Sequence, residues 1–179
     1  IGMSLANLGD VALRRGDPNR AEQLLQEGLE YQLAARVPWG IIVCLKKLGL
    51  VAFNFGRLEK ATQRWQQALG LALRFTLVSE ALETLVYFAG LDGARGQRAR
   101  ALQTLEIIRG NPALPREVTG LLEKHYDHLE QSCTPDELAH ARRLAQTSDV
   151  RRWIEEGLGI TPLDIDQISA YSAEISEDK

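Results

Sequence analysis

The sequence predicts an all-α protein: a right-handed α-solenoid of helix–turn–helix repeats, closed by further helices at its C-terminal end. A motif returns at a constant shift along the chain, apolar side chains lie three or four positions apart within each copy, and a glycine follows the first apolar stretch of each copy. Because one pair of helices cannot bury both of its apolar faces alone, successive pairs must stack on one another. A chain of 179 residues is long enough to bury such a core.

The copies can be read directly. The segment LGDVALRRGDPNRA at residues 8–21 returns as LGLVAFNFGRLEKA at 48–61 and, more faintly, as FAGLDGARGQRARA at 88–101. The positions that match across the shift are Leu5/Leu45/Leu85, Leu8/Leu48/Phe88, Gly9/Gly49/Ala89, Gly16/Gly56/Gly96, Ala21/Ala61/Ala101 and Leu25/Trp65/Leu105. We therefore expect three helix pairs in residues 1–110, at about 3–35, 39–75 and 78–110.

Each unit is expected to begin with an amphipathic helix, as the spacing of Leu5, Leu8 and Ala12 indicates in the first copy. Gly16 falls just past that helix, where a left-handed C-terminal cap costs glycine little and other residues more. Asp17 can then cap the second helix, and the proline after it suits the first helical position, where no amide hydrogen is needed.

Small residues recur where the two helices of a pair would approach most closely. They are Gly9, Gly49 and Ala89 in the first helices and Ala21, Ala61 and Ala101 in the second helices. Bulkier side chains follow in the second helices, at Leu25, Trp65 and Leu105. We expect these bulkier side chains to face the next pair of the stack.

This pattern resembles the tetratricopeptide repeat family: Leu-x-x-Leu-Gly in the first helix, glycine seven positions on, then alanine, then leucine or tryptophan, with Gly28 and Ala68 at a later small position. The resemblance covers the predicted pairs in residues 1–110. It implies a non-catalytic protein-interaction, sensor or scaffold module whose first helices line a concave groove.

The chain departs from the family at several positions. The proline at the end of the second helix is replaced by Leu33, Leu73 and Ala113, and Asp92 stands where the first two copies have alanine. The shift from Leu8 to Leu48 is also longer than the family's usual period of about 34 residues. A longer period implies longer helices, which resembles the sub-type at the C-terminal end of bacterial signalling ATPases and transcriptional activators of the maltose-regulator and AfsR-like kind.

Residues 111–159 are expected to close the stack. A seventh helix is predicted over 115–131, and the next begins with Thr134 as its N-cap, a proline and a capping-box glutamate. A short helix around 149–158 would be anchored by Trp153 and Ile154. In the acidic tail at 160–179, the apolar residues Ile165, Ile168, Tyr171 and Ile175 have helical spacing. The tail is either one docking helix or disordered, and we favour a loosely held helix.

Composition limits the class of partner. A net charge of −3 gives no reason to expect a nucleic acid. The spacing of Cys44 and Cys133 suggests no disulfide framework, no apolar run approaches a membrane span, and the start lacks a signal peptide, so we expect a soluble, cytoplasmic protein. The helical pattern is already under way by Met3, without an initiator methionine, so we expect a piece of a longer protein with further repeats upstream.

No residue pattern predicts catalysis, a cofactor or a metal. His125, His128 and His140 match no zinc spacing. The glycine-rich segment 90–96 lacks the lysine and Ser/Thr of a phosphate loop, so a helix cap explains it better. Cys44 has no nearby base, and no serine has a positional tie to a histidine and an acid. We expect no enzyme activity.

The predicted binding surface is the groove lined by the first helices. Its residues are Asp10, Leu13, Arg14, Val43, Lys46, Leu50, Phe53, Asn54, Glu83, Val86 and Tyr87. Apolar side chains there would be unusual on a solvated face, and an apolar patch with polar groups around it fits a bound peptide or helix. The partner would be a protein or peptide, including other domains of a parent chain. The groove could equally be covered by neighbouring repeats or by the terminal helices.

Three other functions stay open at this point. A regulatory domain that acts alone could bind a peptide or small ligand. An RNA-reading repeat would show a shorter period and a basic groove, and RNA affinity that depends strongly on salt. A small metalloenzyme would purify with bound metal.

Overall fold

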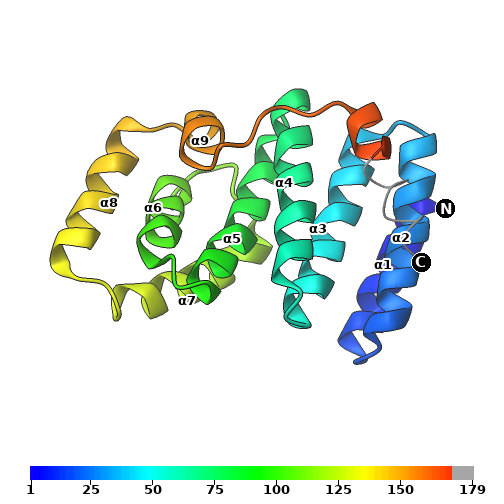
Figure 1. Cartoon of the computed structure of the whole chain (residues 1–179), viewed down its shortest axis with the longest axis horizontal. Coiled ribbons are helices and arrows are strands. Elements are labelled where there is room, and N and C mark those ends of the chain that lie inside the picture. The colour runs from blue at the N-terminus through cyan, green and yellow to red at the C-terminus, as the bar shows by residue number, and fades with distance from the viewer. Residues whose placement is uncertain (171–179) are drawn as a thin grey trace. The chain divides into compact units, whose positions relative to one another are not determined.

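The computed structural model describes residues 1–170, which form helices joined by turns and contain no strand (Figure 1). The predicted all-α class is therefore confirmed for this part of the chain. The described residues belong to two compact units: Ile1–Leu77 with residues 162–170, and Val78–Thr161. None of the helices in the described range is long and apolar enough to cross a bilayer.

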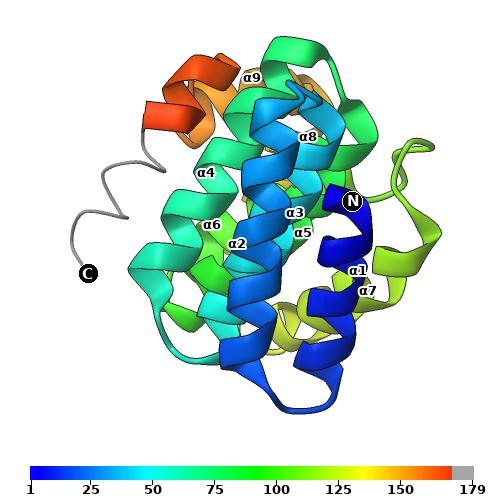
Figure 2. The ribbon, with the colours of Figure 1, turned by 90° about the vertical axis from the view of Figure 1, so that its right-hand side faces the viewer.

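Two helix pairs make up most of the first unit. They are α1 (Gly2–Arg14) with α2 (Pro18–Ala34), and α3 (Pro38–Asn54) with α4 (Leu58–Phe75). The two helices of each pair run side by side along their lengths, as both views show for α1 and α2 (Figures 1 and 2). The expected start of α2 is confirmed, because Asp17 accepts a hydrogen bond from the backbone N–H of Arg20 and Pro18 occupies the first turn.

The same glycine contact joins the helices of both pairs. A Cβ added to Gly9 would lie 2.7 Å from Cγ of Leu25, and one added to Gly49 would overlap Nε1 of Trp65. The Trp65 indole N–H donates to the carbonyl of Lys46, at 3.1 Å. The expected close approach at the glycines is confirmed. The expectation that Leu25 and Trp65 face the next pair is wrong for these contacts, because each side chain fills the space that its own pair's glycine leaves.

The same cap geometry ends each helix from the first to the fifth, so the cap repeats at half the period of the sequence motif. The backbone N–H groups of Asp17, Val37, Arg57, Leu77 and Gln97 each donate to the carbonyl five positions earlier. The residues before these donors, Gly16, Arg36, Gly56, Thr76 and Gly96, all have positive φ. The glycine caps that the sequence predicts are confirmed, and two non-glycine residues adopt the same left-handed conformation after the second helices. Each structural step is thus one helix with its turn.

The second unit begins with α5 (Val78–Ala94) and a shorter α6 (Arg98–Ile108). Gly110, two residues past the end of α6, has a positive φ of 78°. It continues with α7 (Arg116–Glu130) and α8 (Pro135–Thr147), which contacts α6. The capping box of α8 is confirmed, with Thr134 and Glu137 exchanging both hydrogen bonds.

The predicted short helix at 149–158 forms as α9 (Val150–Arg152), which continues into a π-helical turn, Trp153–Gly157. Trp153 and Ile154 are buried, as expected of anchors, and the indole N–H donates to the hydroxyl of Thr104 at 3.1 Å. The Trp153 ring lies so close to Gly157 that a Cβ there would overlap it.

A buried ion pair explains why the third copy departs from the repeat pattern. Asp92 stands where the first two copies have alanine, and its side chain is fully buried. Arg100 in α6 donates to both carboxylate oxygens, at 2.8 and 2.5 Å, and keeps 37% of its own side chain exposed. The carboxylate is tolerated because both of its oxygens are paired.

We predict that Gly49→Ala destabilises the protein by about 1–3 kcal/mol, because the new methyl group overlaps the Trp65 indole. Gly120→Ala is the matched control: Gly120 lies inside α7 with open space around it, so alanine there should stabilise by up to about 1 kcal/mol. Urea unfolding monitored by circular dichroism measures both changes. Equal effects of the two substitutions would contradict the close contact.

We predict unequal effects of removing the two partners of the Asp92–Arg100 pair. Arg100→Ala leaves a buried carboxylate without a cation and should cost about 3–5 kcal/mol. Asp92→Ala should cost clearly less, because the partly exposed guanidinium can be hydrated. The free energy of unfolding of each variant gives the comparison, and an equal or opposite order would refute this account.

Candidate functional site

The structure leaves only part of the predicted groove open. In the first unit, Asp10, Leu13, Leu50 and Phe53 are partly exposed, and Arg14 and Asn54 are exposed. In the second unit, Glu83 and Tyr87 are partly exposed. Val43, Lys46 and Val86 are buried, so the expectation that they line an open surface is wrong. For Val43 and Lys46 the physical reason is that α3 contacts α1, α2 and α4 and has little free surface.

Charged side chains occupy the open part of the α1–α3 surface. The Asp10 carboxylate accepts from Arg14 at 2.9 Å and lies 3.4 Å from Nζ of Lys47, so it joins α1 to α3. Lys47 is not among the predicted groove residues, and the only signal for it in the sequence is its place beside Lys46. The Arg14 side chain is 79% exposed, so its ion pair with Asp10 stabilises little, whereas only about a quarter of each side chain in the Asp10–Lys47 pair is exposed.

Two of the predicted aromatic groove residues have structural partners. The Phe53 ring lies 5.8 Å from the Trp65 ring, which makes it part of the packing between α3 and α4. The Tyr87 hydroxyl donates to Glu83, one turn earlier on α5, at 2.9 Å. Part of the apolar surface predicted for this groove, the Phe53 ring, is therefore used in packing within the fold.

A stronger apolar surface lies on a different side of α1. Ile1, Leu8 and Val11 are 82%, 54% and 44% exposed. Ser4, which has the same helical spacing, is exposed as well. The residues at the matching positions of α3, Ile41, Leu48 and Val51, are 0%, 3% and 1% exposed. We call Ile1, Ser4, Leu8 and Val11 the α1 outer face.

The contacts of α3 reveal what covers the equivalent face there. Gly40, Cys44, Leu48 and Val51 lie on one side of α3, three or four positions apart. On that side a Cβ added to Gly40 would overlap the Gln32 side chain at the end of α2. Helices α1 and α2 both contact α3, and on this side the preceding pair reaches Gly40 through Gln32.

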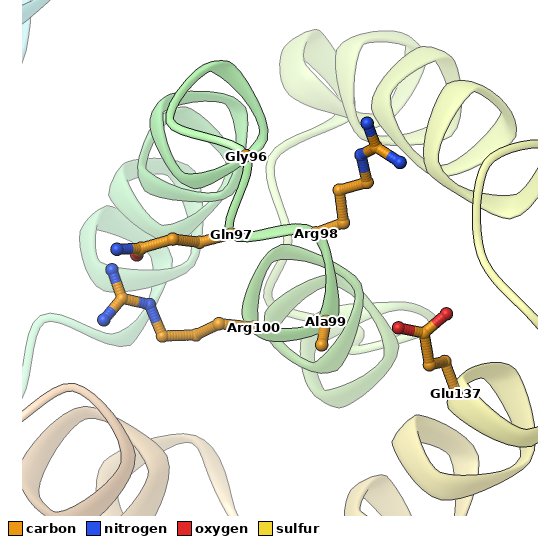
Figure 3. A pocket seen from close by; sticks show the side chains of 6 residues that line it. All are labelled: Gly96, Gln97, Arg98, Ala99, Arg100 and Glu137. Atoms are coloured by element: carbon orange, nitrogen blue, oxygen red, sulfur yellow. The ribbon is translucent and has the colours of Figure 1, made fainter.

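In the second unit, one open pocket is lined by Gly96, Gln97, Arg98, Ala99, Arg100 and Glu137 (Figure 3). Two of its charged groups serve the fold. Arg100 holds Asp92, and Glu137 accepts from the backbone N–H of Thr134, a hydrogen bond that lowers the pKa of the Glu137 carboxyl. The glycine-rich segment 90–96 ends in the left-handed cap at Gly96, as predicted.

His125 and Cys44 have surroundings typical of structural side chains. His125 packs against Gly90, and burial lowers the pKa of its imidazole, while His128 and His140 are exposed. Within residues 1–170, His, Cys, Asp and Glu side chains form no group of three or more that could hold a metal ion. Burial raises the pKa of the Cys44 thiol to about 11 and so disfavours the reactive thiolate.

Comparisons of the chain with protein-family models, with curated proteins and with solved structures find no match.

Proposed function

We propose that this chain is a non-catalytic protein-interaction module built as a solenoid of tetratricopeptide-like helix pairs, and that the α1 outer face receives another helix pair. Three features support the solenoid: the glycine contact shared by the first two pairs, the caps that recur once per helix, and the match between exposed positions on α1 and buried positions on α3. The last of these carries the functional proposal.

The exposed apolar residues also indicate the kind of partner. On α3, the preceding pair contacts the equivalent side, and the amide of Gln32 near the end of its second helix lies against Gly40. A partner for α1 would be a helical hairpin that packs on α1 as this pair packs on α3. Leu8 and Val11 would then supply the buried contact, since burying a large aliphatic side chain contributes about 1.5–3 kcal/mol.

The partner is thus another helical segment, in keeping with a sensor or scaffold role. The resemblance to the C-terminal repeats of bacterial signalling ATPases and transcriptional regulators gives the proposed setting, a cytoplasmic signal-transduction protein in which repeats contact other domains.

A tandem protein supplies a defined helix pair and tests the α1 outer face. Residues 1–40 are duplicated ahead of residue 1, which preserves the register of the repeat. In this protein we expect Leu8→Ala, in the original copy, to cost about 2–5 kcal/mol of unfolding free energy, as for a core leucine. In the single-copy chain the same substitution should cost under about 0.5 kcal/mol, as on a surface. Urea unfolding of the four proteins measures the difference.

Two controls complete this experiment. Phe55→Ala removes another exposed apolar side chain, outside the α1 outer face, and should have the same small effect in both backgrounds. Sedimentation of the single-copy chain tests for self-association. A small cost of Leu8→Ala in the tandem protein, or a dimer that Leu8→Lys dissociates, would overturn the proposal of a docked helix pair.

A further inference from the structure

We propose that the first unit carries a second binding surface, at the ends of α2 and α4, which recognises a short acidic and aliphatic peptide. In this structure the chain's own residues 163–168, Leu-Asp-Ile-Asp-Gln-Ile, occupy it. We call these residues the C-terminal strap. The strap, drawn in orange to red, returns to the end of the first unit at which α2 and α4 finish (Figures 1 and 2). This site goes beyond the proposed function and shares no residue with the α1 outer face.

The strap is held by three polar contacts with α2 and α4. The backbone N–H of Leu163 donates to the carbonyl of Gly70 at 3.0 Å. The Arg74 side chain donates to Asp164 at 2.6 Å. Arg36, just past the end of α2, donates to both carboxylate oxygens of Asp166, at 2.6 and 3.3 Å.

The backbones of both arginines are positioned by the fold rather than by the strap. Arg74 lies in the last turn of α4, and Arg36 has the left-handed conformation of the recurring helix cap, with a φ of 51°. Their spacing selects two carboxylates separated by one residue, as in Asp-x-Asp. The hydrogen bond from the Arg36 guanidinium also lowers the pKa of the Asp166 carboxyl.

Two isoleucines supply the apolar part of the recognition pattern. Ile165 is 5% exposed and Ile168 is fully buried, in a segment whose acidic side chains stay exposed. Residues 165–170 are helical, so the two isoleucines, three positions apart, lie on the same side of the turn. Tyr171 and Ile175, which the sequence analysis placed in the same helix, lie outside the described residues.

The strap also carries its own helix start. The Gln167 side chain accepts from the backbone N–H of Asp164 at 2.7 Å, and the backbone N–H of Ile168 donates to the Asp164 carbonyl at 3.3 Å. This is one half of a capping box. The cap is internal to the strap, so a separate peptide with the same residues brings its own cap to the binding surface.

The polar anchors of the strap are weak enough to exchange. More than half of each strap aspartate and of its arginine partner is exposed, and pairs of this kind stabilise little. Burial of Ile165 and Ile168 and attachment in the same chain together keep the site occupied, because a tethered ligand has a high effective concentration. A peptide with the pattern Leu-Asp-Ile-Asp-x-x-Ile on another molecule would compete for the same surface.

The test measures binding of a fluorescent peptide, residues 160–170, to full-length chains by anisotropy. One chain carries Asp164→Lys and Asp166→Lys, which loosens the strap and leaves the site intact. We expect it to bind the peptide at least tenfold more tightly than the wild-type chain does. The control chain, Glu27→Lys with Glu30→Lys, makes the same charge change at exposed positions of α2 and should bind like the wild type.

A charge swap tests the residues of the site. Arg36→Glu with Arg74→Glu, added to the loosened chain, should weaken its affinity for the wild-type peptide at least tenfold. The same chain should instead bind a peptide with lysine at 164 and 166. A peptide with aspartate in place of Ile165 and Ile168 should bind to none of the chains.

The proposal is overturned if the loosened chain keeps its helical circular dichroism but binds the peptide no better than the wild type does. It is also overturned if the swap leaves the choice of peptide unchanged. Because the α1 outer face is intact in all these chains, neither result bears on the docked helix pair.

Discussion

The contact between a glycine on the first helix and a large side chain on the second sets the geometry of both pairs in the first unit. At Gly49 the Trp65 indole occupies the space where a side chain would be, and its N–H donates to a carbonyl of the facing helix. Gly9 and Leu25 repeat the arrangement with a smaller side chain. Because the glycine lets the helices approach and the large residue fills the gap, each pair packs as one piece.

The helix caps determine how these pieces follow one another. A left-handed residue after each helix gives α1 to α5 nearly the same relation between helix end and next turn. Regular steps place equivalent residues in equivalent surroundings. A face that is buried on α3 and exposed on α1 is therefore a candidate contact surface. The regularity ends with α6, which is short, and the second unit instead uses the Asp92–Arg100 pair and the Trp153 anchor.

The first unit thus presents two surfaces of different chemistry. The α1 outer face is aliphatic and suits a helix pair, whereas the surface at the ends of α2 and α4 pairs two arginines with acidic residues next to buried isoleucines. The first could bind by burial of apolar area, and the second by charge pattern and by the fit of one helical turn.

Local physical rules let the sequence by itself determine the helices, their glycine caps, the capping box at Thr134 and the close approach at Gly49. Each of these depends on residues near one another in the chain or on a repeat visible in it. Only the tertiary structure decided that Val43, Lys46 and Val86 are buried, that Asp10 meets Lys47, and that Arg36 and Arg74 hold the strap. Helical spacing specifies which residues share a side of a helix, but burial depends on which distant segment covers that side. That choice comes from the combined packing of several helices, which no single stretch of sequence encodes.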